Sequence, residues 1–330
     1  MRLLWKKFRP LARGAYRIFG GLRGFMYDFQ RYLRFGGWRE NLNDKSLRNY
    51  KLAMAYHGLE KSLSFKKRKP NSGWSNAERV YRKLKVANNI MNIGFHDKAG
   101  KEVLLQFLNL PENKKTNRAS KMINDVTKFD FKDDFQNHGS ISFKSEDYGK
   151  GILEDPESFF LSRYSLRDFQ QKNINPKDIE RAIKMAMKTP SVCNRQAWHI
   201  YHSNKPEIIK KVLEYQNGNR GFGNQVPELF IIGVDLRAFF VGQEHYQHWI
   251  DGGLFSMSLI YTLHALGIAS CALNWSQTPD IDKKIRKIIT IDKHHTIIMM
   301  LAAGYPNTEN KVCSSKRKPI EEIYSQIELK

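Results

Sequence analysis

Two stretches decide the fold of this chain: SRYSLRDF at residues 162–169 and TPSVCNRQAWH at residues 189–199. The first carries guanidinium groups and the second carries amide groups, and each lies at the boundary between two predicted elements. Guanidinium forks match anions, and amides match the donor and acceptor edges of polar rings. Together, the two clusters suit one long, anionic, planar ligand.

The first stretch places Arg163 and Arg167 four residues apart, with Ser165 between them. On a helix these arginines would share one face, where two guanidinium groups can bind the oxygens of a phosphate. The alternative is that both are solvated surface charges beside Asp168. The motif alone does not decide between these interpretations.

The second stretch places Asn194 and Gln196 after a Pro-Ser turn and before the predicted strand that begins near Trp198. Amide groups both donate and accept hydrogen bonds, which suits the alternating N and C=O edge of an isoalloxazine ring. The alternative is a polar turn capped by Asn194, with Trp198 filling the core.

Two further segments follow. Residues 265–275 read ALGIASCALNW, which predicts a glycine-capped helix end that passes into a short strand. Residues 315–319 read SKRKP and would bring more positive charge to a phosphate. The alternative for this last segment is an ordinary basic tail.

In this order, the four segments resemble the FMN-dependent nitroreductase family. The family pattern Arg-x-Ser-x-Arg-x-Phe is matched from Arg163 to Phe169, and Pro-Ser-x-x-Asn-x-Gln-Pro-Trp is matched from Pro190 to Trp198, except that Ala197 replaces the second proline. Residues 298–306, IMMLAAGYP, resemble the strand and Gly-Tyr-Pro turn that precede the family's final basic segment. The resemblance covers residues 159–330.

The resemblance implies an α+β, nitroreductase-like fold, with a mixed, largely antiparallel sheet flanked by helices and a helical N-terminal extension. It implies hydride transfer between NAD(P)H, the flavin N5 and a small electron-poor or surface-polysaccharide-related substrate by a ping-pong mechanism. NADH or NADPH would be a transient reductant, because no dinucleotide-binding glycine fingerprint is present. It also implies a homodimer with two flavins at the subunit interface, each touched by both chains.

The resemblance also implies which residues hold FMN: Arg163, Tyr164, Ser165, Arg167, Pro190, Ser191, Asn194, Gln196, Leu273, Asn274 and Arg317. No side chain is assigned as catalytic. The candidates near the chemistry are the backbone of Asn274 and Trp275, together with His57. The family usually has an acidic residue and a glycine where this chain has Asn274 and Trp275, so the ring contacts stay open.

Charge divides the chain into two parts. The formal net charge is +22, and residues 1–150 carry 32 Lys and Arg against 14 Asp and Glu. This excess predicts an anionic partner for the front half, whether membrane surface, nucleic acid or acidic polymer. Nucleic acid ranks below membrane because no zinc-finger, homeodomain or RNP pattern is present. The three cysteines lack paired spacing, so no disulfide framework or metal site is expected.

Residues 1–40 interleave Arg and Lys with large apolar side chains, including Leu3, Leu4, Trp5, Phe8 and Phe25. Arginines interrupt every apolar run before it reaches the length of a signal-peptide core or a spanning helix. The pattern is typical of an interfacial segment that lies on anionic lipid. The alternative is a helix that packs its aromatics on its own protein. We therefore expect a cytoplasmic protein. The alternative is a cytoplasmic protein that associates peripherally with the inner face of the membrane.

Residues 41–128 are predicted to be helical, with breaks at 70–73 and 110–111, and residues 129–158 are predicted to be a mobile linker. Residues 57–64, HGLEKSLS, resemble the front extension of nitroreductase-like proteins from bacterial surface-polysaccharide loci. His57 and Glu60 would be a base and its orienting carboxylate, a lid over the flavin, or a helix-surface hydrogen bond.

Residues 159–330 are predicted to form the flavin domain, with helices over 174–188 and 249–266 and strands over 199–203, 228–235, 269–274 and 296–303. The helix over 249–266 is too apolar for a monomer surface, which indicates a core or subunit interface. The alternative function is a non-catalytic flavin- or anionic-surface-binding protein whose basic front half anchors it to a membrane or an acidic polymer.

Overall fold

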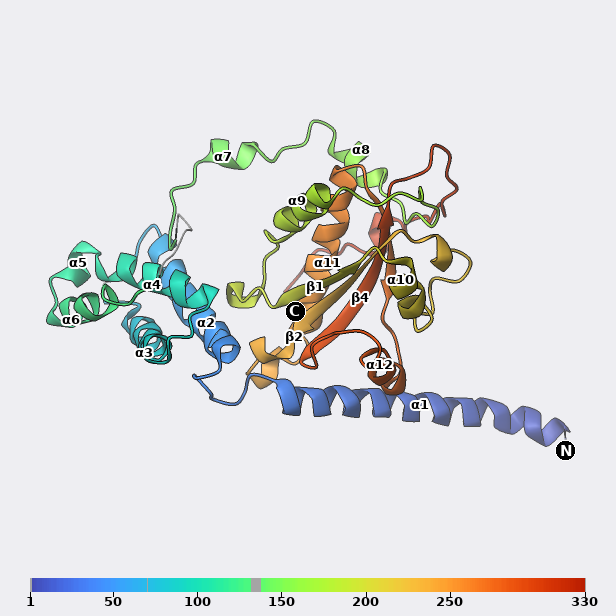
Figure 1. Ribbon diagram of the computed structural model, residues 1–330, viewed down its shortest axis with the longest axis horizontal. Helices are drawn as coiled ribbons and strands as arrows, with labels where there is room; N and C mark the ends of the chain where they lie inside the picture. Colours follow the sequence, from blue (N-terminus) through green and yellow to red (C-terminus); the bar gives the residue numbers. More distant parts are fainter. Residues whose placement is uncertain (1, 70, 132–137, 330) are drawn as a thin grey trace.

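The computed structural model describes residues 2–69, 71–131 and 138–329. Within them, one four-stranded sheet has the strand order β1-β2-β4-β3, with every neighbouring pair antiparallel. Helices cover both faces of this sheet, and a separate group of helices lies beside it (Figure 1). The predicted α+β fold is therefore confirmed.

The strands of the sheet lie close to their predicted positions and have these bounds: β1 Trp198–Ser203, β2 Glu228–Asp235, β3 Ala269–Asn274 and β4 His295–Gly304. The helices around the sheet are α9 Pro176–Ala186, α10 Pro206–Leu213, α11 Gln247–Ala265 and α12 Pro279–Ile285. The predicted helices over 174–188 and 249–266 correspond to α9 and α11.

The central strand β2 explains why the sheet has two cores. Its residues are buried on both faces, and side chains alternate between the faces along a strand. Leu229 and Ile231 pack in the core with residues of α10 and α12. Phe230, Ile232 and Val234 pack in the core with α9 and α11. Helices α9 and α11 therefore cover one face, and α10 and α12 cover the other (Figure 1).

The helical region has the bounds α2 Lys45–Ser64, α3 Trp74–Ile90, α4 Phe95–Leu108, α5 Pro111–Lys114 and α6 Asn117–Val126. These helices enclose an apolar core of their own. Inside it, the Arg48 guanidinium donates two hydrogen bonds, of 3.1 and 2.9 Å, to the Asp97 carboxylate. Both side chains are fully buried, so loss of one partner would leave an uncompensated charge.

Two short helices lie on the chain between the helical region and the sheet: α7 Ser145–Gly149 and α8 Pro156–Leu161. This connection runs across the top of the view in Figure 1. Residues 132–137 of the predicted linker, and Pro70 of the predicted break at 70–73, lie outside the described residues.

The first element, α1 Arg2–Phe35, is a long helix that lies along α12 and then extends past the body of the protein (Figure 1). Its inward face is polar. Arg23 donates to Asp280 at 2.7 and 2.8 Å, and the Tyr27 hydroxyl donates to Asp282 at 2.7 Å. Arg31 donates to the backbone oxygen of His295 at 2.8 Å. The side chains of Leu3, Leu4, Trp5 and Phe8 lie outside the described ones.

No helix among the described residues combines the length and the apolar character that are needed to cross a membrane.

Candidate functional site

The segment 162–169, here called the arginine segment, is not helical: Ser165 and Phe169 form isolated β-bridges, so the arrangement of Arg163 and Arg167 on one helix face does not apply. Ser165 forms a parallel bridge with Ser270 of β3, and the Leu166 amide donates to the Ser270 oxygen at 3.0 Å. Leu166 and Phe169 are buried and anchor the segment. In extended chain, alternate residues share a face, so Arg163, Ser165 and Arg167 can still lie together.

The carboxy-terminal segment, residues 313–319, approaches the arginine segment at Cys313, whose Sγ is 3.7 Å from the Arg167 Nη1. Arg317 follows four residues later, is exposed, and donates to the backbone oxygen of Ser315. In the part of the chain that the structure describes, neither Arg163 nor Arg167 forms an ion pair with a carboxylate. Their charges are therefore available for an external anion.

The end of β3 supplies the second group of predicted site residues, Leu273, Asn274 and Trp275. Leu273 is buried, whereas Asn274 is exposed and its backbone oxygen accepts from Gln216 Nε2 at 2.9 Å. The Trp275 indole N–H donates to Asp282 at 3.0 Å inside the core. The Trp275 side chain therefore fixes the end of β3 and leaves only its backbone for a ligand.

The arginine segment and the end of β3 lie along one edge of the sheet. Ser270 and Asn274 are both in β3, which is an edge strand. Four residues of extended strand span about 13 Å. This separation suits a ligand with an anionic group at one end and a polar ring at the other.

The third group is the turn at residues 190–196, here called the amide turn. Cys193, Asn194 and Gln196 have φ values of 50°, 52° and 52°, in the left-handed region that non-glycine residues rarely adopt. The backbone N–H of Gln196 donates to Ser191 Oγ at 3.0 Å and closes the turn. Such outliers persist where the surrounding structure enforces them, often at binding sites.

Arg195 anchors the turn in the protein interior, and sequence reasoning missed it. Its buried guanidinium donates to both Glu244 carboxylate oxygens, at 2.9 and 2.6 Å, and to the Ala238 oxygen at 2.6 Å. It also lies 4.5 Å from the centre of the Phe240 ring. Burial is the largest single influence on the Arg195 pKa and lowers it, but the hydrogen bonds and charge of Glu244, together with Cys193, outweigh burial, so the Arg195 pKa is raised. With Arg195 held inward, Asn194 and Gln196 lie at the surface.

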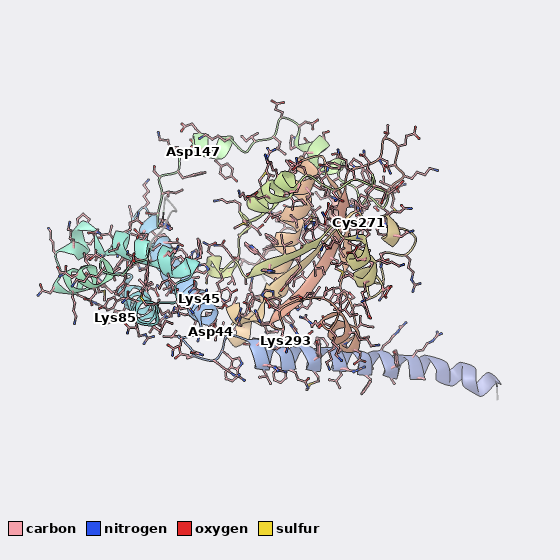
Figure 2. The ribbon with its side chains drawn as sticks, viewed as in Figure 1. Asp44, Lys45, Lys85, Asp147, Cys271 and Lys293 are labelled. Carbon is pink, nitrogen blue, oxygen red and sulfur yellow. The ribbon has the colours of Figure 1, made fainter. Side chains whose placement is uncertain are left out.

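The amide turn lies at the other edge of the sheet from the arginine segment. It leads into β1, whose Trp198 pairs with Val234, and Val234 pairs with Thr296 at the start of β4. Ser270 pairs instead with Ala303, near the end of β4. In Figure 2, Cys271 marks the β3 side, and Lys45, which lines a cavity with Gln196, lies far from it near the helical region.

The separation can be estimated from sheet geometry. From Thr296 to Ala303, seven residues of strand cover about 23 Å, and three strand spacings add about 14 Å sideways. A flavin and its short ribityl chain do not bridge such a distance. The end of β3 is nearer to the amide turn, since Asn274 pairs with Met299, three residues or about 10 Å along β4 from Thr296, but the same three strand spacings separate them. Within one copy, the structure therefore brings together the arginine segment and the β3 end and leaves the amide turn across the sheet.

The helical region contacts the amide turn through His96, another residue that sequence reasoning missed. The Tyr56 hydroxyl is 2.7 Å from His96 Nδ1, and the imidazole also hydrogen-bonds the Arg195 backbone. A cavity of about 370 Å³ lies between the two regions, and its lining includes Lys45, Asn49, Tyr50, Phe95, His96 and Gln196. His57, the sequence-based candidate, is on α2 with its Nδ1 3.1 Å from Glu60.

His96 predicts how stability depends on pH, because burial lowers its pKa to about 4. Between pH 6.5 and pH 4 the unfolded chain binds a proton that the folded chain excludes. The free energy of unfolding therefore falls with falling pH in this window, by up to about 1.4 kcal/mol per pH unit from this group. Urea unfolding at several pH values measures the slope.

The matched variants for this measurement are His96→Gln and His245→Gln. The first removes one of three buried histidines whose pKa is lowered to about 4, the others being His248 and His295, and should reduce the slope by about one proton. The second changes an exposed histidine and should leave the slope as it is. Equal slopes in the original protein and in His96→Gln would contradict the assignment.

Among the described residues, Asp235, His294 and His295 place potential metal-ligand atoms within 4.8 Å of one another. The Arg237 guanidinium, however, donates to both oxygens of Asp235 at 2.8–3.1 Å. The Tyr50 hydroxyl also donates to Asp235, at 3.0 Å. Because these donors occupy the carboxylate, we interpret the group as an ion-pair network that joins α2 to the sheet.

Comparison with known proteins places the similarity in the carboxy-terminal half. Residues 161–219, which include the arginine segment and the amide turn, match the model of the nitroreductase family. A protein of Archaeoglobus fulgidus named NADH dehydrogenase/NAD(P)H nitroreductase is 25% identical over 158 residues, which cover 48% of this chain and 88% of that protein. The 4-nitrobenzoate reductase of a Nocardioides species is 20% identical over 233 residues, 53% of this chain and 93% of that protein.

Solved structures with a similar arrangement include an FMN-dependent nitroreductase from Clostridium difficile. It is 16% identical, has a TM-score of 0.44, and is matched over 52% of this chain and 98% of its own. A nitroreductase family protein from Streptococcus pneumoniae is 20% identical, with a TM-score of 0.45 over 52% of this chain and 98% of its own.

Proposed function

We propose that this protein is an FMN-dependent oxidoreductase of the nitroreductase type, which takes hydride from NADH or NADPH and passes it to a small electron-poor substrate. The observation that carries the proposal is the β3 edge. At one end lie Arg163 and Arg167, which form no ion pair with an acid among the described residues, and at the other end lies the exposed Asn274. The family match over 161–219 supports it, because it covers the arginine segment and the amide turn.

The residues present fit FMN. Arg163 and Arg167 would bind the phosphate, with the Ser165 hydroxyl between them, and Arg317 would approach from the carboxy-terminal segment. The backbone at Leu273 and Asn274 would face the ring. Bound FMN supplies hydride transfer at its N5, and the protein supplies binding and orientation.

The amide turn would complete the site from a second copy of the chain. Asn194 and Gln196 lie at the surface but at the far edge of the same sheet. In a two-fold dimer, a residue of one copy can meet a different residue of its partner, and the relation holds in reverse. The amide turn of one copy would then hydrogen-bond the flavin on the β3 edge of the other, which gives two equivalent sites.

Helix α11 offers the surface for this dimer. Its Trp249, Ile250, Leu254 and Met257 side chains are each more than a third exposed. These residues recur at helical spacing and form an apolar face, which a folded protein normally covers. We infer that a second copy covers it.

The helical region would shape the substrate side of the site. Its cavity of about 370 Å³ includes Gln196 in the lining, together with Lys45 and Ser46 at the start of α2. These side chains offer hydrogen-bond donors and acceptors, which suits a small polar substrate. A substrate related to surface polysaccharides stays a prediction from the resemblance of residues 57–64.

The test is the absorption spectrum of the purified full-length protein before and after NADH or NADPH is added without oxygen. We expect a flavin spectrum, FMN as the released chromophore, bleaching by the reductant, and recovery when a nitroaromatic acceptor is added. Because reductant and acceptor would bind in turn, initial rates should give the parallel double-reciprocal lines of a ping-pong mechanism.

Two outcomes would contradict the proposal in different ways. A colourless protein that cannot be loaded with FMN would rule out the flavin site. A yellow protein that neither reductant bleaches would favour the alternative, a flavin-binding protein without turnover.

A further inference from the structure

Helix α1 has the reverse of the usual arrangement in a water-soluble protein, because its polar side faces the protein and its apolar side faces outward. Arg23, Tyr27 and Arg31 recur every four residues and bind the body. On the opposite side, an apolar stripe is exposed along the helix. The stripe consists of Ile18, Leu22, Phe25, Phe29 and Leu33.

The stripe is large and continuous. Its members recur at intervals of three or four residues, which places them on one face of the helix. Phe25 is 69% exposed and Ile18 is 75% exposed. Scattered exposed apolar side chains need no explanation, but a contiguous row of this kind marks an interaction surface.

Charge indicates the partner of the stripe. Residues 1–40 carry ten Lys and Arg against two acidic residues, and the whole chain has a net charge of +22. Arg13, Arg17 and Arg34 lie in the same helix as the stripe and are exposed. These arginines lie on the sides of α1 away from the stripe, so the charge acts through the chain as a whole: a second copy would add its own net charge of +22, whereas an anionic lipid surface attracts the chain.

We propose that α1 binds the surface of an anionic membrane, lying parallel to the bilayer with the stripe inserted among the lipids, and that the net positive charge of the chain attracts it to that surface. The 34 residues of α1 span about 50 Å of helix. Because ion pairs and hydrogen bonds hold α1 against α12, binding would orient the whole protein at the surface. The proposal does not depend on the flavin site.

The experiment uses the purified full-length protein and sedimentation with vesicles of two compositions. Vesicles that contain phosphatidylglycerol and phosphatidylcholine should bind the protein, vesicles of phosphatidylcholine alone should bind it weakly, and added salt should weaken the binding. The double variant Phe25→Ser with Phe29→Ser should lose about a hundredfold in partitioning, because two large apolar side chains no longer enter the lipid.

The matched control is Tyr16→Ser. Tyr16 is 79% exposed, more than Phe25, but lies off the stripe, so its partitioning should be nearly unchanged. The FMN content and the oligomeric state of all three proteins are measured in parallel. Unchanged values in the Phe25 and Phe29 variant are expected, because both side chains project from the body.

Three results would overturn the proposal. The first is failure to bind the phosphatidylglycerol vesicles. The second is equal binding by the stripe variant, because charge alone would then explain binding. The third is dissociation of the stripe variant into monomers, because the stripe would then be a subunit interface.

Discussion

Replacement of both Arg163 and Arg167 by Glu is expected to empty the flavin site, with a loss of FMN affinity of more than about a hundredfold. Hydrogen bonds to a charged group contribute about 1.5–3 kcal/mol each, and the variant replaces two of them with repulsion. Fluorescence titration with FMN measures the affinity, and the flavin-to-protein absorbance ratio after desalting measures occupancy.

This variant should fold normally, because within the described residues neither arginine pairs with a carboxylate. The control is Arg181→Glu on α9, an exposed arginine in the same part of the chain, which should keep FMN. Retention of stoichiometric FMN by the double variant would remove the arginine segment from the site. Loss of FMN from the control as well would show a general charge effect.

The regular elements of the sheet region could be predicted because their patterns are local. The strand at 228–235 is a run of apolar residues between turn signals, and the structure places it in the centre of the sheet. The helix over 249–266 has the length and apolar character that α11 shows. Such patterns depend on neighbours a few residues away, so a single sequence contains them.

The conformation of the arginine segment could not be predicted in the same way. The spacing of Arg163 and Arg167 fits a helix and an extended chain equally well. The bridge between Ser165 and Ser270 decides in favour of extended chain, and it joins residues more than one hundred positions apart. No local pattern contains that contact.

The structure around the amide turn could not be predicted either, because it also depends on contacts between residues distant in the sequence. Sequence identified Asn194 and Gln196 as ligand candidates, but not the residues that hold them in place. Arg195 binds Glu244, 49 positions away, and His96 reaches the Arg195 backbone from a different group of helices. The separation of the amide turn from the arginine segment also needed the strand order, which the sequence alone did not provide.

The second prediction follows from the distance between the amide turn and the arginine segment. It uses two variants that are expected to lose FMN for different reasons. Arg163→Glu with Arg167→Glu removes the phosphate side of the site. Asn194→Asp with Gln196→Glu removes amide donors at the ring while keeping side-chain size, and Asp tolerates the left-handed backbone of Asn194. We expect each variant alone to lose FMN, because both copies then carry the same defect.

Whether two copies share the flavin site is tested most directly by measuring FMN binding after the two variants are unfolded together and refolded as a mixture. If each site combines the β3 edge of one copy with the amide turn of its partner, the mixed dimer contains one intact site, and random pairing restores roughly a quarter of all sites. The recovered sites should also bleach with NADH or NADPH. No recovery from the mixture, with dimers present, or FMN binding by a monomer would contradict a flavin site shared between two copies.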